Sequence, residues 1–303
     1  MALLLFNRPD TTRQVVREAV AAKPRAVYAI ADGPRTDDPE DEALCKDVRR
    51  IVTEADWGVP VMTDFSDTNL GLKKRVATGL DWVFTHEDEA IILEDDCLPD
   101  PTFFPFAAEL LQRFEKDERV GMISGNNFLW GTTATRESYF FSPDVRIWGW
   151  ATWRRVWRDF SASGLNKERG FDDVRTLVRN IPSPLRQKAL LNTQKTASTT
   201  SWAQPFLLHC VERGYLNPTP HVNLVANIGF GGASTHTSFE SFTADAPRQS
   251  ISFPLRHPES VAAPNHLGAL EARAHRRRLA TFPIRHPFDF LGRVVRFFAH
   301  KLR

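Results

Sequence analysis

The chain has 303 residues, of which 42% are hydrophobic and 25% are charged, and these proportions are typical of a globular protein rather than a disordered or fibrous one. No apolar run approaches the roughly 18 residues that cross a bilayer, which excludes a spanning helix. The net charge of +2 combines a mildly acidic body with a basic C-terminal tail, and this differs from the even basic surface of a nucleic-acid binder.

Short apolar segments alternate with amphipathic segments along the first 127 residues. Thr11 and Gln14 fit a capping box, so we predict that the first helix begins there. Leu72, Val76 and Leu80 recur at helical spacing and predict a second helix at residues 71–84. Buried strands are predicted at residues 2–6, 26–30, 59–63, 90–93 and 121–124. Strands alternating with helices predict an α/β fold with a mostly parallel, twisted sheet flanked by helices.

The pattern changes after residue 127, where aromatic residues become dense. We divide the chain into an α/β half at 1–127, a second and more irregular half at 128–238, and a tail at 239–303. In the second half we expect a helix at 202–212, closed by Gly214, and a strand at 222–225.

The tail carries nine Lys and Arg against two acids from residue 271 onward, for a local net charge of +7. Apolar residues recur there at helical spacing from Phe288 to Phe298. Such a helix suits an anionic membrane surface, and the alternative is a solvated terminal helix packed on its own domain.

Polar clusters follow three of the predicted strands directly, and ligands of open parallel sheets bind beyond the carboxyl ends of the strands. The clusters are Asn7-Arg8, Asp32-Gly33 and Glu94-Asp95-Asp96. Three consecutive acids repel one another and call for a cation, and hard oxygen ligands suit Mg²⁺ or Mn²⁺. The alternative is a solvated acidic turn.

Lys73, Lys74 and Arg75 lie in the first turn of the predicted 71–84 helix. Cations are unfavourable at a helix N-terminus, and a bound anion such as phosphate removes the conflict. The alternative is that these side chains extend into solvent. Together with the acidic cluster they suggest a diphosphate held by a metal ion on one side and by Lys or Arg on the other.

Two further segments contain candidate site residues. The glycine-rich segment 227–237 includes His236, a candidate third metal ligand on a loop that orders over substrate, although a lone His is more often structural. Trp148 and Trp150 lie in the Trp-rich segment 147–153, which either belongs to the core or stacks on a sugar.

Several motifs, in order along residues 2–237, resemble those of bacterial GT-A-fold glycosyltransferases related to family 2 (the hemolytic-protein-like group) and, more distantly, N-acetylglucosaminyltransferase I. The matching stretches are Phe6-Asn-Arg-Pro-Asp10, Ala31-Asp-Gly-Pro-Arg35, Asn69-Leu-Gly-Leu-Lys-Lys74, Ile92-Leu-Glu-Asp-Asp-Cys-Leu-Pro99, Trp148-Gly-Trp-Ala-Thr-Trp153 and Val222-Asn-Leu-Val-Ala-Asn-Ile-Gly-Phe-Gly231 with Thr235-His-Thr237. The acidic cluster and the last of these blocks are specific in combination.

The resemblance implies a nucleotide-sugar donor, in particular a UDP-sugar, with Mn²⁺ or Mg²⁺ bridging its diphosphate. It implies that Asp96 and His236 bind the metal, that Glu94 and Asp95 face the ribose and the metal waters, and that Asp32 reads the nucleoside. The donor site it implies is formed by Asn7, Arg8, Asp32, Gly33, Asn69, Lys73, Lys74, Glu94 and Asp95, and the acceptor site by Trp148, Trp150 and Trp202.

One position departs from the family. Relatives commonly carry Trp-Asp at the place of Trp202-Ala203, where the Asp is a candidate general base, and Ala203 cannot accept a proton. We therefore predict a metal-dependent hexosyl- or N-acetylhexosaminyltransferase that acts on a hydroxyl acceptor, such as a surface glycan, without assigning its base. The alternatives are a nucleotide-sugar- or glycan-binding module without catalysis, and a nucleotidyltransferase.

The expected cellular location is the cytoplasm, with membrane contact at its inner face if the tail binds lipid. Cys45, Cys97 and Cys210 include no C-x-x-C pair, which argues against a zinc site or a disulfide scaffold. The apolar run at residues 2–6 is too short for a signal peptide. We expect no nucleic-acid partner, because no basic stripe crosses the predicted folded part.

Overall fold

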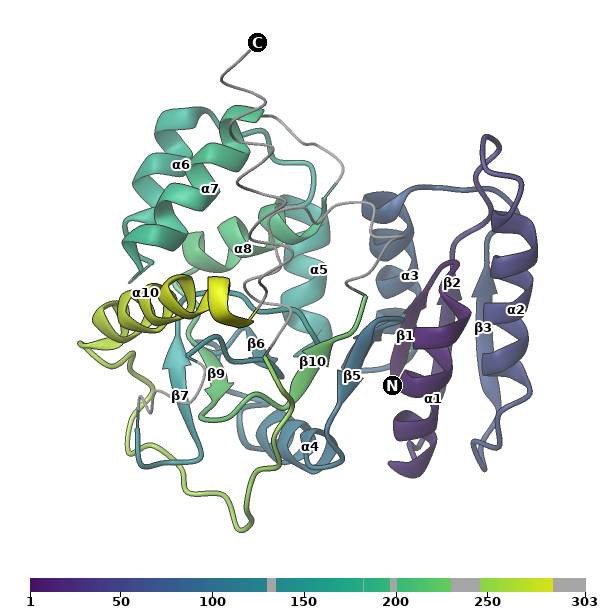
Figure 1. The fold of residues 1–303 in the computed structure, drawn as a ribbon, viewed down its shortest axis with the longest axis horizontal. Coiled ribbons are helices and arrows are strands. Elements are labelled where there is room, and N and C mark those ends of the chain that lie inside the picture. Colours follow the sequence, from purple (N-terminus) through teal and green to yellow (C-terminus); the bar gives the residue numbers. More distant parts are fainter. Residues whose placement is uncertain (130–134, 182, 197–200, 230–245, 286–303) are drawn as a thin grey trace.

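The computed structural model describes residues 1–129, 135–181, 183–196, 201–229 and 246–285, and Figure 1 shows their arrangement. A six-stranded sheet with the order β3-β2-β1-β4-β8-β6 forms the centre of the molecule. Its strands are β1 (Ala2–Leu5), β2 (Val27–Ala31), β3 (Val61–Phe65), β4 (Glu89–Glu94), β6 (Met122–Ser124) and β8 (Trp150–Trp153).

The first four of these strands in chain order, β1 to β4, form the parallel part of the sheet. The helices between them are α1 (Pro9–Ala21), α2 (Asp41–Thr53) and α3 (Leu72–His86). The chain moves outward from β1 to β2 and β3 and then returns to place β4 on the other side of β1. With right-handed crossovers, α1 and α2 cover one face and α3 the other, and α1 and α2 contact each other directly. The reversal between β1 and β4 is the topological switch point of the sheet.

The second half of the chain completes the same sheet. Strand β8 pairs antiparallel with both β4 and β6, and two small antiparallel sheets lie beside it. These pair β5 (Cys97–Pro99) with β10 (Val225–Asn227), and β7 (Tyr139–Ser142) with β9 (Asn217–Pro220). The helices of this part are α4 (Phe103–Arg113), α5 (Arg154–Ser163), α6 (Phe171–Val178), α7 (Pro184–Thr196), α8 (Ala203–Glu212) and α10 (Leu267–Arg285).

The core extends through both halves as one hydrophobic cluster. Trp150, Trp157 and Trp202 are at most 1% exposed, and Trp150 stacks on Trp202 with ring centroids 5.5 Å apart. Burying such large rings stabilises the fold by several kcal/mol. The predicted boundary at residue 127 therefore divides a chain whose two halves share one sheet and one core.

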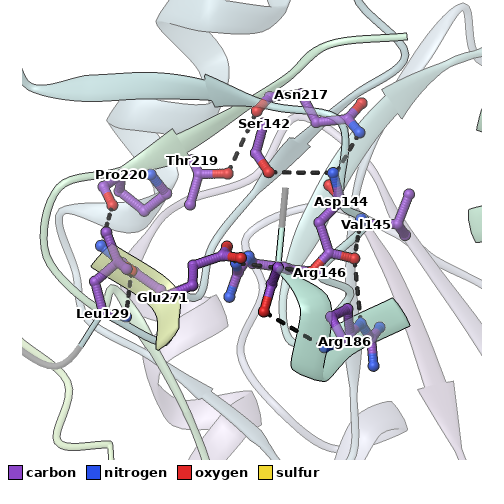
Figure 2. A network of polar contacts seen from close by, with 12 residues as sticks. Leu129, Ser142, Asp144, Val145, Arg146, Arg186, Asn217, Thr219, Pro220 and Glu271 are labelled. Carbon is purple, nitrogen blue, oxygen red and sulfur yellow. Dashed lines mark hydrogen bonds and ion pairs between the residues drawn. The ribbon is translucent and has the colours of Figure 1, made fainter. Parts of the chain in front are cut away.

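Helix α10 is attached to the second half by a buried ion-pair network, which Figure 2 shows. Arg146, only 4% exposed, binds Glu271 of α10 at 2.5 Å and lies 3.7 Å from Asp144. Arg186 of α7 pairs with the same Asp144 at 3.3 Å. Burial raises the pKa of Glu271 despite its contact with Arg146. Leu267 and the other apolar residues on this side of α10 pack on a small separate cluster that includes Leu129 and Phe140.

The predicted α/β class, with a mostly parallel sheet flanked by helices, is confirmed. The predicted start of the first helix is wrong by three residues, because Arg8 is the N-cap in place of Thr11 and Pro9 is the first helical residue. Thr11 and Thr12 donate hydrogen bonds to the Arg8 carbonyl instead of capping the helix. The tail helix that we predicted around residues 288–298 lies outside the described residues. Within the described part of the chain, no helix combines the length and hydropathy needed to cross a bilayer.

Candidate functional site

The strand register brings the three predicted polar clusters to one edge of the sheet. Leu5 of β1 is opposite Ala31 of β2, and Leu4 is opposite Glu94 of β4. The residues that follow these strands therefore leave the sheet side by side at the switch point, where ligands of such sheets bind. With a strand spacing of about 5 Å, the ends of β2 and β4 are about 10 Å apart, with the end of β1 between them.

Asp32, at the end of β2, organises the turn that leads into α3. Its carboxylate accepts backbone hydrogen bonds from Gly33 at 2.9 Å, Leu70 at 2.8 Å and Gly71 at 3.0 Å. Gly71 has a φ of 79°, which favours glycine. The three bonds make Asp32 a positioning residue for the α3 N-terminus.

Gly33 and Asn69 complete this turn. The Asn69 side chain donates to the Gly33 carbonyl at 2.9 Å. A Cβ at Gly33 would overlap the backbone of Thr68, so only glycine allows the two segments to approach this closely. Both predicted donor residues therefore hold the backbone of the site edge in place.

The acids after β4 form a carboxylate pair with Arg8 as its cation. The Arg8 Nη1 atom lies 2.5 Å from Asp96 Oδ2 and 4.0 Å from Asp95 Oδ1. The second oxygen of Asp95 accepts the Phe6 backbone N–H at 3.0 Å. Glu94, the third acid of the cluster, is half-buried as the last residue of β4. Two of the predicted acids thus point into one space together with Arg8.

This arrangement perturbs the protonation of the pair. Burial, followed by the negative charge of Asp96, raises the pKa of Asp95 to about 7, while Arg8 and the Phe6 N–H act in the opposite direction. A divalent cation bound to both carboxylates would lower the pKa of Asp95 again, because it stabilises the charged form of each carboxylate more than one guanidinium does.

The fit of a divalent ion depends on the donor set. Asp95 and Asp96 offer the hard oxygen donors that Mg²⁺ and Mn²⁺ prefer. Among the described residues, no three His, Cys, Asp or Glu side chains are grouped so as to hold a metal ion. The predicted third ligand, His236, lies outside the described residues. Asp95 and Asp96 therefore supply two of the oxygen donors that such an ion needs, and the Arg8 guanidinium lies against both carboxylates.

The beginning of the glycine-rich segment packs directly on Asp96. Asn227, the last residue of β10, donates its side-chain N–H to Asp96 Oδ1 at 3.3 Å, and the Ile228 N–H donates to the Asp96 carbonyl at 2.8 Å. A Cβ at Gly229 would overlap the Asp96 carboxylate and approach Arg8. The described start of this segment thus meets the acidic cluster, as the proposed site requires.

The three basic residues of α3 separate into two groups. Arg75 is 6% exposed and pairs with Asp64 of β3, so the anion-binding role that we predicted for it is corrected. Lys73 is half-buried and Lys74 is exposed, and neither forms an ion pair with any described residue. The first N–H groups of α3 have no partner within the helix. Lys73 and Lys74 therefore lie, without an ion-pair partner among the described residues, in the first turn of α3, which begins directly after Gly71, whose N–H is bonded to Asp32.

Asp41 is a buried acid, bonded to the predicted site residue Asn7, that the sequence analysis did not single out. It is fully buried at the start of α2, where it accepts a hydrogen bond from Asn7 at 2.6 Å and another from Arg35 at 2.6 Å. These bonds, above all that from Arg35, lower the pKa of Asp41 to about 2. Asn7, predicted to contact the donor, thus has its amide on Asp41, and Arg35 lies over the Phe6 ring. The feature of the sequence that could have pointed to Asp41 is its position as an acid in the first turn of α2.

The predicted acceptor residues differ in accessibility. Trp150 and Trp202 are buried and packed on each other, so they offer no ring face to an acceptor, and we correct their role to that of core residues. Trp148 is half-buried, and Phe128 contacts it edge-on at 5.1 Å. Trp148 alone remains a candidate for acceptor contact. Ala203 is the first residue of α8, directly after Trp202.

No protein-family model matches the chain. No curated protein matches it in sequence. Among solved structures, it is similar to the mannosyltransferase PcManGT from Pyrobaculum calidifontis in complex with GDP-Man and Mn²⁺, at 15% identity, 59% coverage of this chain and a TM-score of 0.38. The match spans 51% of that mannosyltransferase chain, about half of its length. A second similar structure is a UDP-glucose pyrophosphorylase complexed with UDP-glucose, at 11% identity, 52% coverage of this chain, 70% coverage of that one and a TM-score of 0.27. Likenesses of this degree leave the function to be argued from the site itself.

Proposed function

We propose that the chain is a GT-A-type glycosyltransferase that uses a nucleotide-diphosphate-sugar. One observation carries this proposal: two different groups lie at the switch point of the sheet. The first is the Asp95–Asp96 pair with Arg8, at the end of β4. The second is the N-terminus of α3, which carries Lys73 and Lys74 and is bonded to Asp32 at the end of β2. The strands that lead to these two groups, β2 and β4, end about 10 Å apart with β1 between them, and this spacing leaves room for a diphosphate with a nucleoside on one side and a sugar on the other.

Each group has a chemical role in this proposal. Lys73, Lys74 and the N–H groups of α3 would bind phosphate oxygens. Mn²⁺ or Mg²⁺, held by Asp96 with Asp95, would supply positive charge to the departing diphosphate. In the reaction, the bond between the sugar C1 and the diphosphate oxygen breaks, and a bond between C1 and the acceptor oxygen forms while the acceptor releases a proton. Ala203 is not the base that takes this proton.

The proposed donor class is tested by a thermal-shift screen, since a ligand that binds the folded state raises the melting temperature by mass action. The panel contains UDP, GDP, UDP-glucose and GDP-mannose, each with and without Mn²⁺, and uses uridine, guanosine and ATP as controls. The proposal predicts that at least one nucleoside diphosphate or its sugar raises the melting temperature while the nucleosides do not. Absence of any shift across the panel would refute it.

Two measurements separate the alternatives. A nucleotidyltransferase would release pyrophosphate from a nucleoside triphosphate and a sugar 1-phosphate, whereas a glycosyltransferase releases nucleoside diphosphate from the donor. A binding module without catalysis would bind the donor and release neither. The chain also lacks the glycine-rich loop with a basic residue that a nucleotidyltransferase carries after its first strand, because Asn7-Arg8-Pro9 leads directly into α1.

A further inference from the structure

Arg8 forms its side-chain contacts with the two carboxylates that would hold the metal ion. Its guanidinium lies 2.5 Å from Asp96 and 4.0 Å from Asp95, and no other Lys or Arg among the described residues forms a salt bridge with either acid. The two carboxylate side chains are 11% and 12% exposed, so little water screens them from the guanidinium. Among the described residues, Arg8 is therefore the cation that balances the charge of Asp95 and Asp96 when no ligand is bound.

The surroundings leave little space for a second cation. The other oxygen of Asp96 faces Asn227, and the other oxygen of Asp95 accepts the Phe6 N–H. Gly229 closes the same space, since even a Cβ there would overlap Asp96 and approach Arg8. A divalent ion that binds Asp95 Oδ1 and Asp96 Oδ2 together would take the place of the Arg8 guanidinium, which lies 2.5 Å from Asp96 Oδ2 and 4.0 Å from Asp95 Oδ1.

Arg8 is able to move. It is the N-cap residue of α1, its side chain is 27% exposed, and its long stem allows several positions of the head group. A displaced guanidinium needs a new anion, and the proposed donor brings a diphosphate, which arginine binds well through two parallel hydrogen bonds.

We propose that Arg8 competes with the divalent ion for Asp95 and Asp96 and transfers to the diphosphate of the donor when the ion binds. The ion and the nucleoside diphosphate then bind cooperatively. The ion releases Arg8 from the carboxylates so that it can bind the diphosphate, and the diphosphate holds Arg8 away from the carboxylates that bind the ion. This inference rests on the proposed function for the identity of the diphosphate, whereas the competition between Arg8 and the ion is independent of it.

The first part is tested with Mn²⁺ alone, whose binding is followed by electron paramagnetic resonance of the free ion. The wild type is compared with Arg8→Gln and with Arg13→Gln, a matched control on the exposed side of α1. Arg8→Gln should bind Mn²⁺ about tenfold more tightly than the wild type, because a neighbouring positive charge is lost and the carboxylates are freed. Arg13→Gln should match the wild type. Arg8→Lys, which keeps the charge, serves as a second variant and should stay within about threefold of the wild type.

The second part repeats the titration with saturating UDP or GDP. The Mn²⁺ affinity of the wild type should rise on the order of tenfold when the nucleotide is bound. The affinity of Arg8→Gln should rise much less, because this variant has no guanidinium that competes with the ion. Equal Mn²⁺ affinity of wild type and Arg8→Gln would overturn the inference, as would an equal gain from the nucleotide in both. If neither nucleotide binds the wild type, the proposed function fails, while the comparison with Mn²⁺ alone still decides the role of Arg8.

Discussion

Replacing Asp95 by Asn should stabilise the metal-free protein at neutral pH, and the gain should depend on pH. Asp95 is 7% exposed and faces Asp96, and these two causes raise its pKa from 3.8 to about 7. Between pH 4 and pH 7, the unfolded chain has released this proton while the folded protein retains it. The folded state thus binds more protons than the unfolded state, so the free energy of unfolding falls as the pH rises through this window and levels off above it.

The pKa shift sets the magnitude of this effect. Each unit by which folding raises the pKa of Asp95 corresponds to about 1.4 kcal/mol of stability lost across this pH window. The amide of Asn carries no charge and still offers an oxygen to the Phe6 N–H. The stability of Asp95→Asn relative to the wild type should therefore rise from pH 4 to pH 8, by at least about 1 kcal/mol.

Urea unfolding in the presence of EDTA at pH 4.5, 6, 7 and 8 measures this difference, with tryptophan fluorescence as the signal. Asp67→Asn, at an exposed position of the turn before α3, is the control and should show no such trend. A constant difference between Asp95→Asn and the wild type at all four pH values would refute the reasoning.

Further predictions concern other parts of the fold. Arg146→Met leaves Glu271 without its partner and should cost about 3 to 5 kcal/mol in urea unfolding, and adding Glu271→Leu should recover part of that loss. Asp32→Ala removes the acceptor of three backbone N–H groups and should cost about 2 to 4 kcal/mol, whereas Asp32→Asn should cost less than half as much; equal losses would contradict the hydrogen-bond account. Trp202→Ala should lower the free energy of unfolding by about 3 to 5 kcal/mol and Trp148→Ala by much less, which separates a core ring from a half-buried one. The full chain should sediment with vesicles that contain an anionic lipid and not with neutral ones, because residues 271–303 carry a net charge of +7; binding that persists at high salt would contradict an electrostatic contact.

The parallel part of the sheet was predictable from local sequence because its buried strands are short continuous apolar runs. Strand β3 lies two residues later than predicted, since its pairing with β2 begins at Val61 opposite Val27. Strand β9, which the sequence analysis missed, contains Pro218 and Pro220 and pairs with β7 in a two-stranded sheet, where proline is tolerated at an edge. The fold of the second half depends on such pairings between distant segments, which local patterns do not encode.

The positions of the site residues were more predictable than their partners. Strand polarity alone brings Arg8, Asp32 and Asp96 to one edge, as predicted. Which side chain binds which depends on packing between elements far apart in the sequence. Arg75 illustrates the limit, because it shares a helical turn with Lys73 and Lys74 but points inward to Asp64. Burial also decided the role of Trp202, whose sequence context alone suits either the core or a sugar site.

Calorimetric titration of the nucleoside diphosphate identified by the screen tests the central claim most directly. The wild type should bind it at least about tenfold more tightly than the corresponding nucleoside, because in the proposed site the N-terminus of α3 binds phosphate oxygens. Lys73→Ala/Lys74→Ala should lose most of this preference, while a control with two exposed lysines elsewhere replaced, Lys46→Ala/Lys116→Ala, should keep it. Equal affinity of the wild type for nucleoside and diphosphate, or an unchanged preference in Lys73→Ala/Lys74→Ala, would contradict the account.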